Sequence, residues 1–348
     1  MKPLGICINM LAKQRTHEND GMDIIEYLDK EDIPYDFIDC YDTDIISRLD
    51  NYSGIWWWYS NFVVADLLEA QHILDIAERK GLKVYPNHNT AWHFDDKVAE
   101  MYALQSVSAP IPSSWVFYKE KECTDWLKTK ANYPLVAKLR NGSGANNVKL
   151  LKNSSDAIKY CKRMFSIGYK PAPSLLYKTK SKVQSTHDFQ TFISRFKQIP
   201  NFLKARKFGQ RMAIERDYCY FQEFIQNDGF DIKVAVVGDK LSYLLRNTRK
   251  GDFRASGGGS IYYNNNIITE QIIHDSFRVA DELGFQCMGF DVVIDNKTGI
   301  GKIIEMCHGF DRKAIYDAGG YFDRDCKWHN IPLHVSNEVV RNMYNIID

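Results

Sequence analysis

The chain has 348 residues, of which 45% are hydrophobic and 26% are charged, and its formal net charge is +1. These values are ordinary for a globular protein and predict a large core divided among two or three domains. A nearly neutral chain has no strong overall field, so any attraction for anions must come from local groups.

Neither export nor membrane insertion is indicated. The apolar run at residues 4–10 is short and polar residues follow it, unlike a signal peptide. No apolar run approaches the roughly 20 residues that span a bilayer. The eight cysteines contain no Cys-x-x-Cys pair, which argues against a disulfide scaffold and a structural zinc site. We therefore expect a cytoplasmic protein with reduced cysteines and no transmembrane segment.

The first third of the chain alternates strands and helices. Apolar runs predict strands at 4–9, 35–38, 54–59 and 83–85, and helical spacing predicts helices at 21–30 and 65–80. This alternation is typical of a small parallel sheet. The first strand lacks a following Gly-x-Gly-x-x-Gly, which disfavours the usual dinucleotide fold.

Three consecutive tryptophans, Trp56, Trp57 and Trp58, end the third strand of this sheet. Ligands often bind at such strand ends, so a substrate role is one interpretation. Alternation along a strand sends Trp57 to the face opposite the other two, so we expect at least one of them in the core.

The middle of the chain predicts a second unit of helices and strands. A helix is expected from residue 95, followed by strands at 114–118, 135–139 and 148–151 and a helix at 155–165. The glycine-containing loop 142–147 is not a Walker A sequence, because no Gly-Lys-Ser/Thr follows it. A plain hairpin turn is the common explanation; a loop whose backbone N–H groups close over phosphates is the alternative.

Residues 168–216 form a strongly basic segment whose only acids are Asp188 and Glu215. Interspersed aromatic residues indicate an ordered segment rather than a linker. It would suit a phosphorylated or uronic-acid substrate, a nucleotide diphosphate sugar, or an anionic membrane surface. The alternative is a solvated helix pair at a homodimer interface. Nucleic acid is disfavoured, because the whole chain is nearly neutral and shows no nucleic-acid motif.

Residues 220–260 hold the densest group of chemically informative residues. The run Gln222-Glu223-Phe224-Ile225 leads into a strand opened by Asp231, and a second strand carries Arg246. A basic, glycine-rich loop follows, with Arg254 and Ser256 in it. Guanidinium groups donate paired hydrogen bonds to phosphoryl groups and carboxylates, and backbone amides of such a loop can approach an anionic substrate.

Two further strands, at 289–293 and 302–305, place Asp291 and Glu305 close together, and a helix is expected at 270–283. Buried carboxylates are costly alone, whereas Mg²⁺ prefers oxygen ligands, so we interpret the pair as a metal site. Lys97 and Lys138 are candidate point charges for phosphate, with solvated surface lysines as the alternative.

Taken in order, these residues resemble the nucleotide and metal site of the ATP-grasp superfamily. The resemblance covers about residues 95–328. The stretch 246–260, with Gly320-Tyr321-Phe322-Asp323 and Trp328-His329, resembles a subgroup often associated with bacterial surface-polysaccharide synthesis, with some likeness to the RimK and glutathione-synthetase branches.

The resemblance implies an α/β fold, α+β in its catalytic part, with four regions along the chain. These are an N-terminal βαβ domain at 1–92, a small subdomain with a phosphate-covering loop at 93–167, the basic insert at 168–216 and a C-terminal subdomain with the metal site at 217–348.

The implied cofactors are ATP and Mg²⁺, and matching positions take the family's roles. The nucleotide-binding set is Lys97, Lys138, Ser143, Gly144, Glu223, Phe224, Ile225 and Asp231. Glu223 would accept a hydrogen bond from the adenine amine, and Asp231 would accept hydrogen bonds from the ribose hydroxyls. Arg246, Arg254 and Ser256 form the catalytic set, and Asp291 and Glu305 are the metal ligands.

One position departs from the family pattern. The family usually shows Glu-x-Asn as its metal pair, whereas this chain has Glu305-Met306-Cys307. A thiol is a poor magnesium ligand, so either Glu305 binds both ions with help from water or the second site is weakened. The plainest interpretation of Cys307 is a small buried residue. The next residue, His308, is a candidate proton acceptor for an attacking amine.

The resemblance implies an ATP-dependent ligase that joins a small carboxylate, which we expect to be anionic overall, to an amine through an acyl phosphate. Two alternatives stay open. One is a kinase that phosphorylates a hydroxyl group. The other is a nucleotide-binding protein without turnover, which the Cys307 departure favours.

Overall fold

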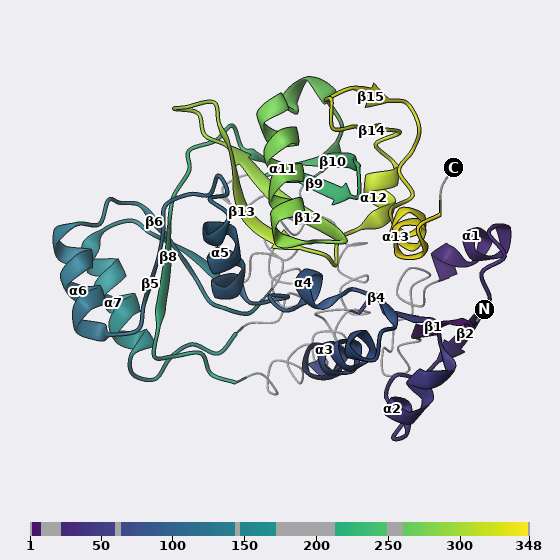
Figure 1. Ribbon diagram of the computed structural model, residues 1–348. Coiled ribbons are helices and arrows are strands. Elements are labelled where there is room, and N and C mark those ends of the chain that lie inside the picture. The colour runs from purple at the N-terminus through teal and green to yellow at the C-terminus, as the bar shows by residue number, and fades with distance from the viewer. Residues whose placement is uncertain are drawn as a thin grey trace, which may run out of the picture.

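The computed structural model describes residues 2–7, 22–59, 64–142, 147–171, 213–248 and 260–346. Across these ranges the strands form one four-stranded parallel sheet and two antiparallel sheets, with helices packed against them (Figure 1). The expected combination of a parallel βαβ part and an α+β part is therefore confirmed.

The N-terminal sheet has the strand order β2-β1-β3-β4. Its strands are β1 (Leu4–Cys7), β2 (Tyr35–Ile38), β3 (Gly54–Trp56) and β4 (Lys83–Tyr85). Around it lie η1 (Met22–Ile24), α1 (Ile25–Lys30), α2 (Ile45–Arg48), η2 (Leu49–Asn51) and α3 (Val64–Arg79). At Gly54 a Cβ atom would stand 2.4 Å from the carbonyl oxygen of Lys83, so the pairing of β3 with β4 requires glycine there.

A second sheet, of order β5-β8-β6-β7, forms the small subdomain. It contains β5 (Ser114–Phe117), β6 (Leu135–Lys138), β7 (Val148–Leu151) and β8 (Cys219–Glu223). Helices α6 (Glu120–Thr129) and α7 (Ser154–Met164) pack together and share a core with this sheet. The short α4 (His88–Ala91) and then α5 (Lys97–Ser106) lead into it. The sheet takes strands from both sides of the basic segment.

The third sheet has the order β13-β12-β9-β10-β14-β15, with β11 paired to β10. Its strands are β9 (Phe230–Val237), β10 (Lys240–Asn247), β11 (Ile261–Tyr262), β12 (Cys287–Ile294), β13 (Gly301–Cys307), β14 (Tyr321–Phe322) and β15 (Trp328–His329). The helical elements of this part are η3 (Asn265–Ile267), α11 (Glu270–Leu283), α12 (Arg312–Tyr316) and α13 (Val335–Tyr344).

The two faces of this third sheet have different partners. Ile232 and Val234 pack with Phe277 of α11. On the opposite face, Ala235 and Val237 pack with α12, α13 and the N-terminal sheet. Helix α11 fits its sequence well, because Thr269 caps its first turn and Gly284, in the left-handed conformation, ends it.

The three tryptophans are all buried, on two sides of the N-terminal sheet. Trp57 packs in the cluster that contains α3 residues, whereas Trp56 and Trp58 face the C-terminal subdomain. This separation confirms the alternation predicted for the strand, and the ring of Trp56 stacks on Tyr85 at 4.7 Å between centroids.

All eight cysteines are free, as expected. Their apparent scatter along the sequence is nevertheless misleading for three of them. Cys123, Cys161 and Cys219 come from α6, α7 and β8, and their Sγ atoms lie within 4.8 Å of one another in the core. The tertiary packing of these three elements creates a proximity that sequence spacing does not show.

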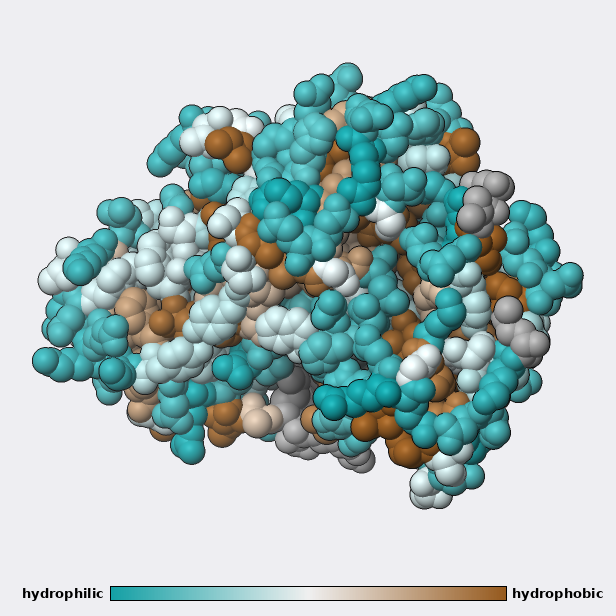
Figure 2. All heavy atoms as spheres, in the orientation of Figure 1, coloured by the Kyte–Doolittle hydropathy of each residue, from teal (hydrophilic) through white to brown (hydrophobic). Residues whose placement is uncertain are grey.

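On the face shown in Figure 2, hydrophilic side chains predominate and hydrophobic ones form small patches between them. Among the helices in the described ranges, none combines the length and the apolar character that crossing a bilayer requires.

Candidate active site

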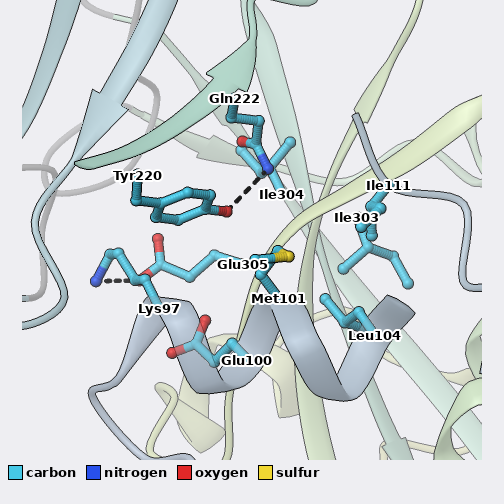
Figure 3. Close-up of a pocket in the computed structure, with 10 residues that line it drawn as sticks. All are labelled: Lys97, Glu100, Met101, Leu104, Ile111, Tyr220, Gln222, Ile303, Ile304 and Glu305. Carbon is cyan, nitrogen blue, oxygen red and sulfur yellow. Dashed lines mark hydrogen bonds and ion pairs between the residues drawn. The ribbon is translucent and has the colours of Figure 1, made fainter. Parts of the chain in front are cut away.

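A narrow cavity lies where α5 of the small subdomain meets strands β8 and β13 (Figure 3). Its lining residues are Lys97, Glu100, Met101, Leu104, Ile111, Tyr220, Gln222, Ile303, Ile304 and Glu305. The cavity measures about 10 Å³, which is room for roughly one water molecule. The two sheets are therefore closed on each other around a group of charged side chains.

Lys97 begins α5 and points into this cavity (Figure 3). The preceding Asp96 caps the helix, accepting hydrogen bonds from Val98 N and Ala99 N at 3.0 Å. The Lys97 ammonium is buried, donates to the carbonyl oxygen of Gly142 at 2.6 Å and pairs with Glu305 Oε1 at 3.3 Å. Burial disfavours its charge, but Glu305 and other nearby acids outweigh burial and raise the pKa of Lys97.

Lys138 ends β6 and reaches across to the third sheet. Its Nζ donates to the carbonyl oxygen of Ile304 at 2.8 Å and lies 6.0 Å from the ring centroid of Tyr220. Burial lowers the pKa of Lys138 to about 8, against the opposing charge of Glu305. Both predicted phosphate-binding lysines are thus buried beside Glu305, which excludes solvated surface lysines as the explanation.

Glu100, which sequence reasoning missed, lies one turn of α5 after Lys97 in the same cavity. Its Oε2 accepts a hydrogen bond from Met306 N at 3.3 Å, and burial raises the pKa of Glu100 to about 8. Residues three apart share a helix face, so this spacing was the available signal.

A second group of charges continues along the third sheet. Asp231 on β9 stands opposite Arg246 on β10, whose Nε and Nη2 donate to its two carboxylate oxygens at 2.7 Å each. Arg246 Nη2 also pairs with Asp291 Oδ1 at 2.9 Å. Lys233 Nζ lies 2.5 Å from the same oxygen. Lys233 was also missed, although the alternation Asp231-Ile232-Lys233 places its side chain on the face of Asp231.

The two groups meet at Asp291 and Glu305, which face each other across β12 and β13. The register shifts immediately after Asp291, so a β-bulge follows this pair. Residues directly opposite each other on one face of a sheet lie close together. The pairing of β12 with β13 therefore brings the two carboxylates together, as predicted.

The charges of this second group alter one another's pKa values. Burial raises the pKa of Asp231 to about 6 despite the opposing charge of Arg246. For Asp291, burial is outweighed by Arg246 and Lys233, which lower its pKa. Asp291 is consequently a carboxylate near neutral pH, and cations surround it.

The side chains that β8 turns toward the cavity do not include Glu223. Tyr220 and Gln222 line the cavity, whereas the Glu223 carboxylate contacts Ser113 N at 3.4 Å and is not among the lining groups. Alternation explains the difference, because Tyr220 and Gln222 share a face and Glu223 takes the other. Ile225 is buried beyond the strand end, and Phe224 lies between it and Glu223.

Four predicted residues, Ser143, Gly144, Arg254 and Ser256, lie outside the described residues. At the end of β13, Cys307 Sγ accepts a hydrogen bond from Gly309 N at 3.2 Å, and burial raises the pKa of its thiol to about 12. His308 is fully buried, with its ring 4.3 Å from that of Phe94, and burial lowers its pKa to about 3. It packs in an aromatic cluster and does not line the cavity.

Comparison with known proteins gives no match among family models and none among curated proteins. Solved structures do match. A RimK domain ATP-grasp protein from Sphaerobacter thermophilus aligns with a TM-score of 0.55 at 13% identity, covering 98% of each chain. D-alanine–D-alanine ligase from Bacillus anthracis, complexed with ATP, aligns with a TM-score of 0.53 at 13% identity over 99% of each chain.

A RiPP-associated ATP-grasp ligase from Chryseobacterium gregarium, in complex with ADP and a leader and core peptide, aligns with a TM-score of 0.56 at 11% identity. The alignment covers 100% of this chain and 98% of that one. At such low identity these similarities concern the fold, and they extend over the whole chain. The chain has the ATP-grasp fold.

Proposed function

We propose that this protein is an ATP-dependent carboxylate–amine ligase that forms an amide through an acyl phosphate. The observation that supports it most is the cross-strand pair of Asp291 and Glu305, held between two sheets with a cation on each acid. Both acids belong to the third sheet, and Lys97, which leads into the small subdomain, pairs with Glu305.

The donor chemistry of these residues fits a magnesium ion. Asp291 and Glu305 offer hard oxygen ligands, and in this structure the side chains of Lys97, Lys233 and Arg246 form ion pairs with them. A divalent cation there would offset the same charges and release the basic groups toward phosphates. When bound, Mg²⁺ would neutralise charge on the phosphates during transfer.

The same exchange of partners would accommodate ATP. Lys97 and Lys138 would donate to phosphate oxygens in place of Glu305 and the Ile304 carbonyl. Adenine would enter the cavity beside Tyr220, with the backbone of the hinge at its edge, and Asp231 would accept from the ribose hydroxyls. Because the cavity holds only about one water, the two sheets must separate for the base to enter.

The chemistry then depends on positioning and charge. A carboxylate oxygen of the acid attacks the γ-phosphorus, and ADP leaves. The amine nitrogen attacks the acyl carbon, phosphate leaves, and the nitrogen loses a proton. Arg246, together with Arg254 and Ser256, would stabilise the transferred phosphoryl group and orient the acyl group.

We propose cytoplasmic small-molecule substrates, with a role in surface-polysaccharide or peptide modification. The sequence resemblance supports a role in surface-polysaccharide synthesis. The similarity to a ligase solved with a leader and core peptide supports a role in peptide modification. The alternative of a protein without turnover has one supporting observation, the thiol at position 307 where the family shows an amide.

The test is release of ADP and phosphate from Mg-ATP, with pooled carboxylates and pooled amines added separately and together. Release that needs both pools, with a new amide mass, is the expected result. A phosphorylated hydroxyl product would replace the ligase with a kinase. ATP binding without release under any pool would favour the protein without turnover.

A further inference from the structure

Arg312 is a buried cation outside the nucleotide and metal site. It is the first residue of α12, shortly after the end of β13, and only 5% of it is exposed. Its guanidinium carbon lies 3.8 Å from the ring centroid of Trp58, just beyond the carboxyl end of β3. It therefore stands at the contact between the N-terminal sheet and the C-terminal subdomain.

One edge of this guanidinium is occupied. Nη1 donates to Ser336 Oγ at 2.6 Å and pairs with Asp23 Oδ2 at 3.1 Å. The Ser336 hydroxyl in turn donates to the same Asp23 oxygen at 2.5 Å. These contacts and the Trp58 ring fix the plane of the guanidinium group.

The other edge has no partner among the described residues. Nε and Nη2 are closed off from solvent, and no group in the described ranges accepts a hydrogen bond from either. Arginine stays protonated at any ordinary pH, so Nε and Nη2 remain hydrogen-bond donors. Buried donors left unpaired are costly and uncommon, which indicates that an acceptor belongs there.

The geometry of the free edge specifies that acceptor. Elsewhere in this molecule, Arg246 donates hydrogen bonds from the same two atoms, Nε and Nη2, to the two carboxylate oxygens of Asp231. Two parallel donors in a rigid plane match the two oxygens of a carboxylate. The carboxyl ends of parallel strands, where Trp58 lies, are also where ligands bind in open sheets.

We propose that the Nε–Nη2 edge of Arg312 binds a carboxylate of a small organic acid at the contact between the N-terminal sheet and α12. The acid enters when the Trp58–α12 contact opens, and it displaces none of the partners that Arg312 has within the described ranges. The identification of this acid as a substrate of the ligase rests on the proposed function; the binding itself does not.

The proximity of Trp58 supplies a direct signal. A carboxylate on the guanidinium draws its charge away from the indole ring and changes tryptophan fluorescence. The full chain is titrated with sodium succinate and, separately, with inorganic phosphate, at constant ionic strength set with sodium chloride and without ATP. We expect a saturable change with succinate in roughly the millimolar range.

The test variant is Arg312→Lys, which keeps the charge and removes the planar fork. It should weaken succinate binding at least tenfold while binding ATP like the wild type. Arg324→Lys is the matched control, because Arg324 also contacts a carboxylate and an aromatic ring but is exposed. Its succinate titration should match that of the wild type.

If Arg312→Lys does not fold, Ser336→Ala serves instead, since it removes one of the two groups that hold the Nη1 edge in place and should weaken succinate binding several-fold. No saturable response of the wild type to succinate, or an unchanged response in the variant, overturns the proposal. Saturation by phosphate alone overturns the assignment of a carboxylate. None of these results bears on the proposed ligase activity. That proposal is contradicted separately if the wild-type protein does not bind ATP.

Discussion

Lys138 is the residue whose position most clearly links the two sheets. Its ammonium is buried beneath the third sheet and satisfied there by one backbone carbonyl, that of Ile304. A phosphate oxygen would be a stronger partner than that carbonyl, because charge-assisted hydrogen bonds exceed neutral ones.

Lys138→Ala should therefore weaken ATP binding by about 10- to 100-fold, the range expected for one hydrogen bond to a charged group. Calorimetric titration with ATP measures the change. Lys149→Ala is the control, because Lys149 lies on the neighbouring strand β7 and is exposed. Unchanged ATP affinity in Lys138→Ala would mean that the nucleotide lies elsewhere.

Cys307 offers a second test at the level of one side chain. Its thiol stays protonated near neutral pH and accepts a hydrogen bond from Gly309 N, so it supplies no hard ligand. Cys307→Asn adds an amide oxygen two residues after Glu305. If a second magnesium site is weakened in this protein, the variant should turn over ATP faster at low Mg²⁺, in a phosphate-release assay against Mg²⁺ concentration. An unchanged Mg²⁺ dependence would show a site built without that position.

Residue context and the family resemblance together predicted much of the charged cluster. Lys138, Asp291 and Glu305 stood out as charges in strands, whereas Lys97 was predicted from the resemblance, and the structure brings the four together. Glu100 and Lys233 were missed because a charge on a helix or strand is usually solvated. Only packing against the other sheet reveals that these two are buried.

The order of elements could be predicted well where apolar periodicity is strong. Strands β2, β4 and β7 have the predicted bounds, and α11 begins and ends at the predicted residues. Helix α6 was not predicted, because only Cys123 and Leu127 of its residues are buried and, apart from Trp126, the rest is polar. The pairing of β8 with β5 and β6 is likewise set by tertiary contacts that a sequence pattern does not specify.

A buried histidine connects the segment after α4 with the segment after α11. His93 follows α4 and packs against Phe285, with ring centroids 5.4 Å apart, and only 1% of it is exposed. Burial lowers the pKa of His93 to about 4 from a usual value near 6.5. The unfolded chain thus takes up this proton at higher pH than the folded one, and the free energy of unfolding falls as pH drops from about 6.5 to 4.

His93→Phe should remove this part of the acid sensitivity. The shift corresponds to about 3 kcal/mol of unfolding free energy lost by the wild type near pH 4. Urea unfolding at pH 7 and pH 4.5 measures the difference. The control is His72→Phe, at an exposed histidine, which should leave the pH dependence unchanged. Equal acid sensitivity in His93→Phe and the wild type would contradict the assignment of a neutral buried imidazole.

At the scale of the whole molecule, three sheets converge on two neighbouring contacts. The small subdomain closes on the third sheet around Lys97, Lys138 and Glu305, and the N-terminal sheet closes on the other side through Trp58 and Arg312. The first contact suits a nucleotide and the second an acid. An acid held by the N-terminal sheet would reach phosphates held by the small subdomain only when both contacts re-form around their ligands.

Both contacts are closed around buried charged groups, among them Lys97, which pairs with Glu305, and Arg312, which pairs with Asp23. A protein that used these charges for stability alone would gain little, because buried ion pairs seldom outweigh the cost of desolvating them. Ligands that take over the same charges give a reason for the arrangement. Under the proposed function, an acyl phosphate would form between the two contacts.

The most direct measurement is hydroxylamine trapping. The protein is incubated with Mg-ATP, pooled carboxylates and hydroxylamine in place of an amine, and hydroxamates and ADP are quantified by mass spectrometry and chromatography, with Glu305→Gln in parallel. We expect the wild type to form a hydroxamate in equal amount with ADP, and Glu305→Gln to form neither product above background. ADP formation with no hydroxamate, or a hydroxamate that forms equally with Glu305→Gln, would contradict this expectation.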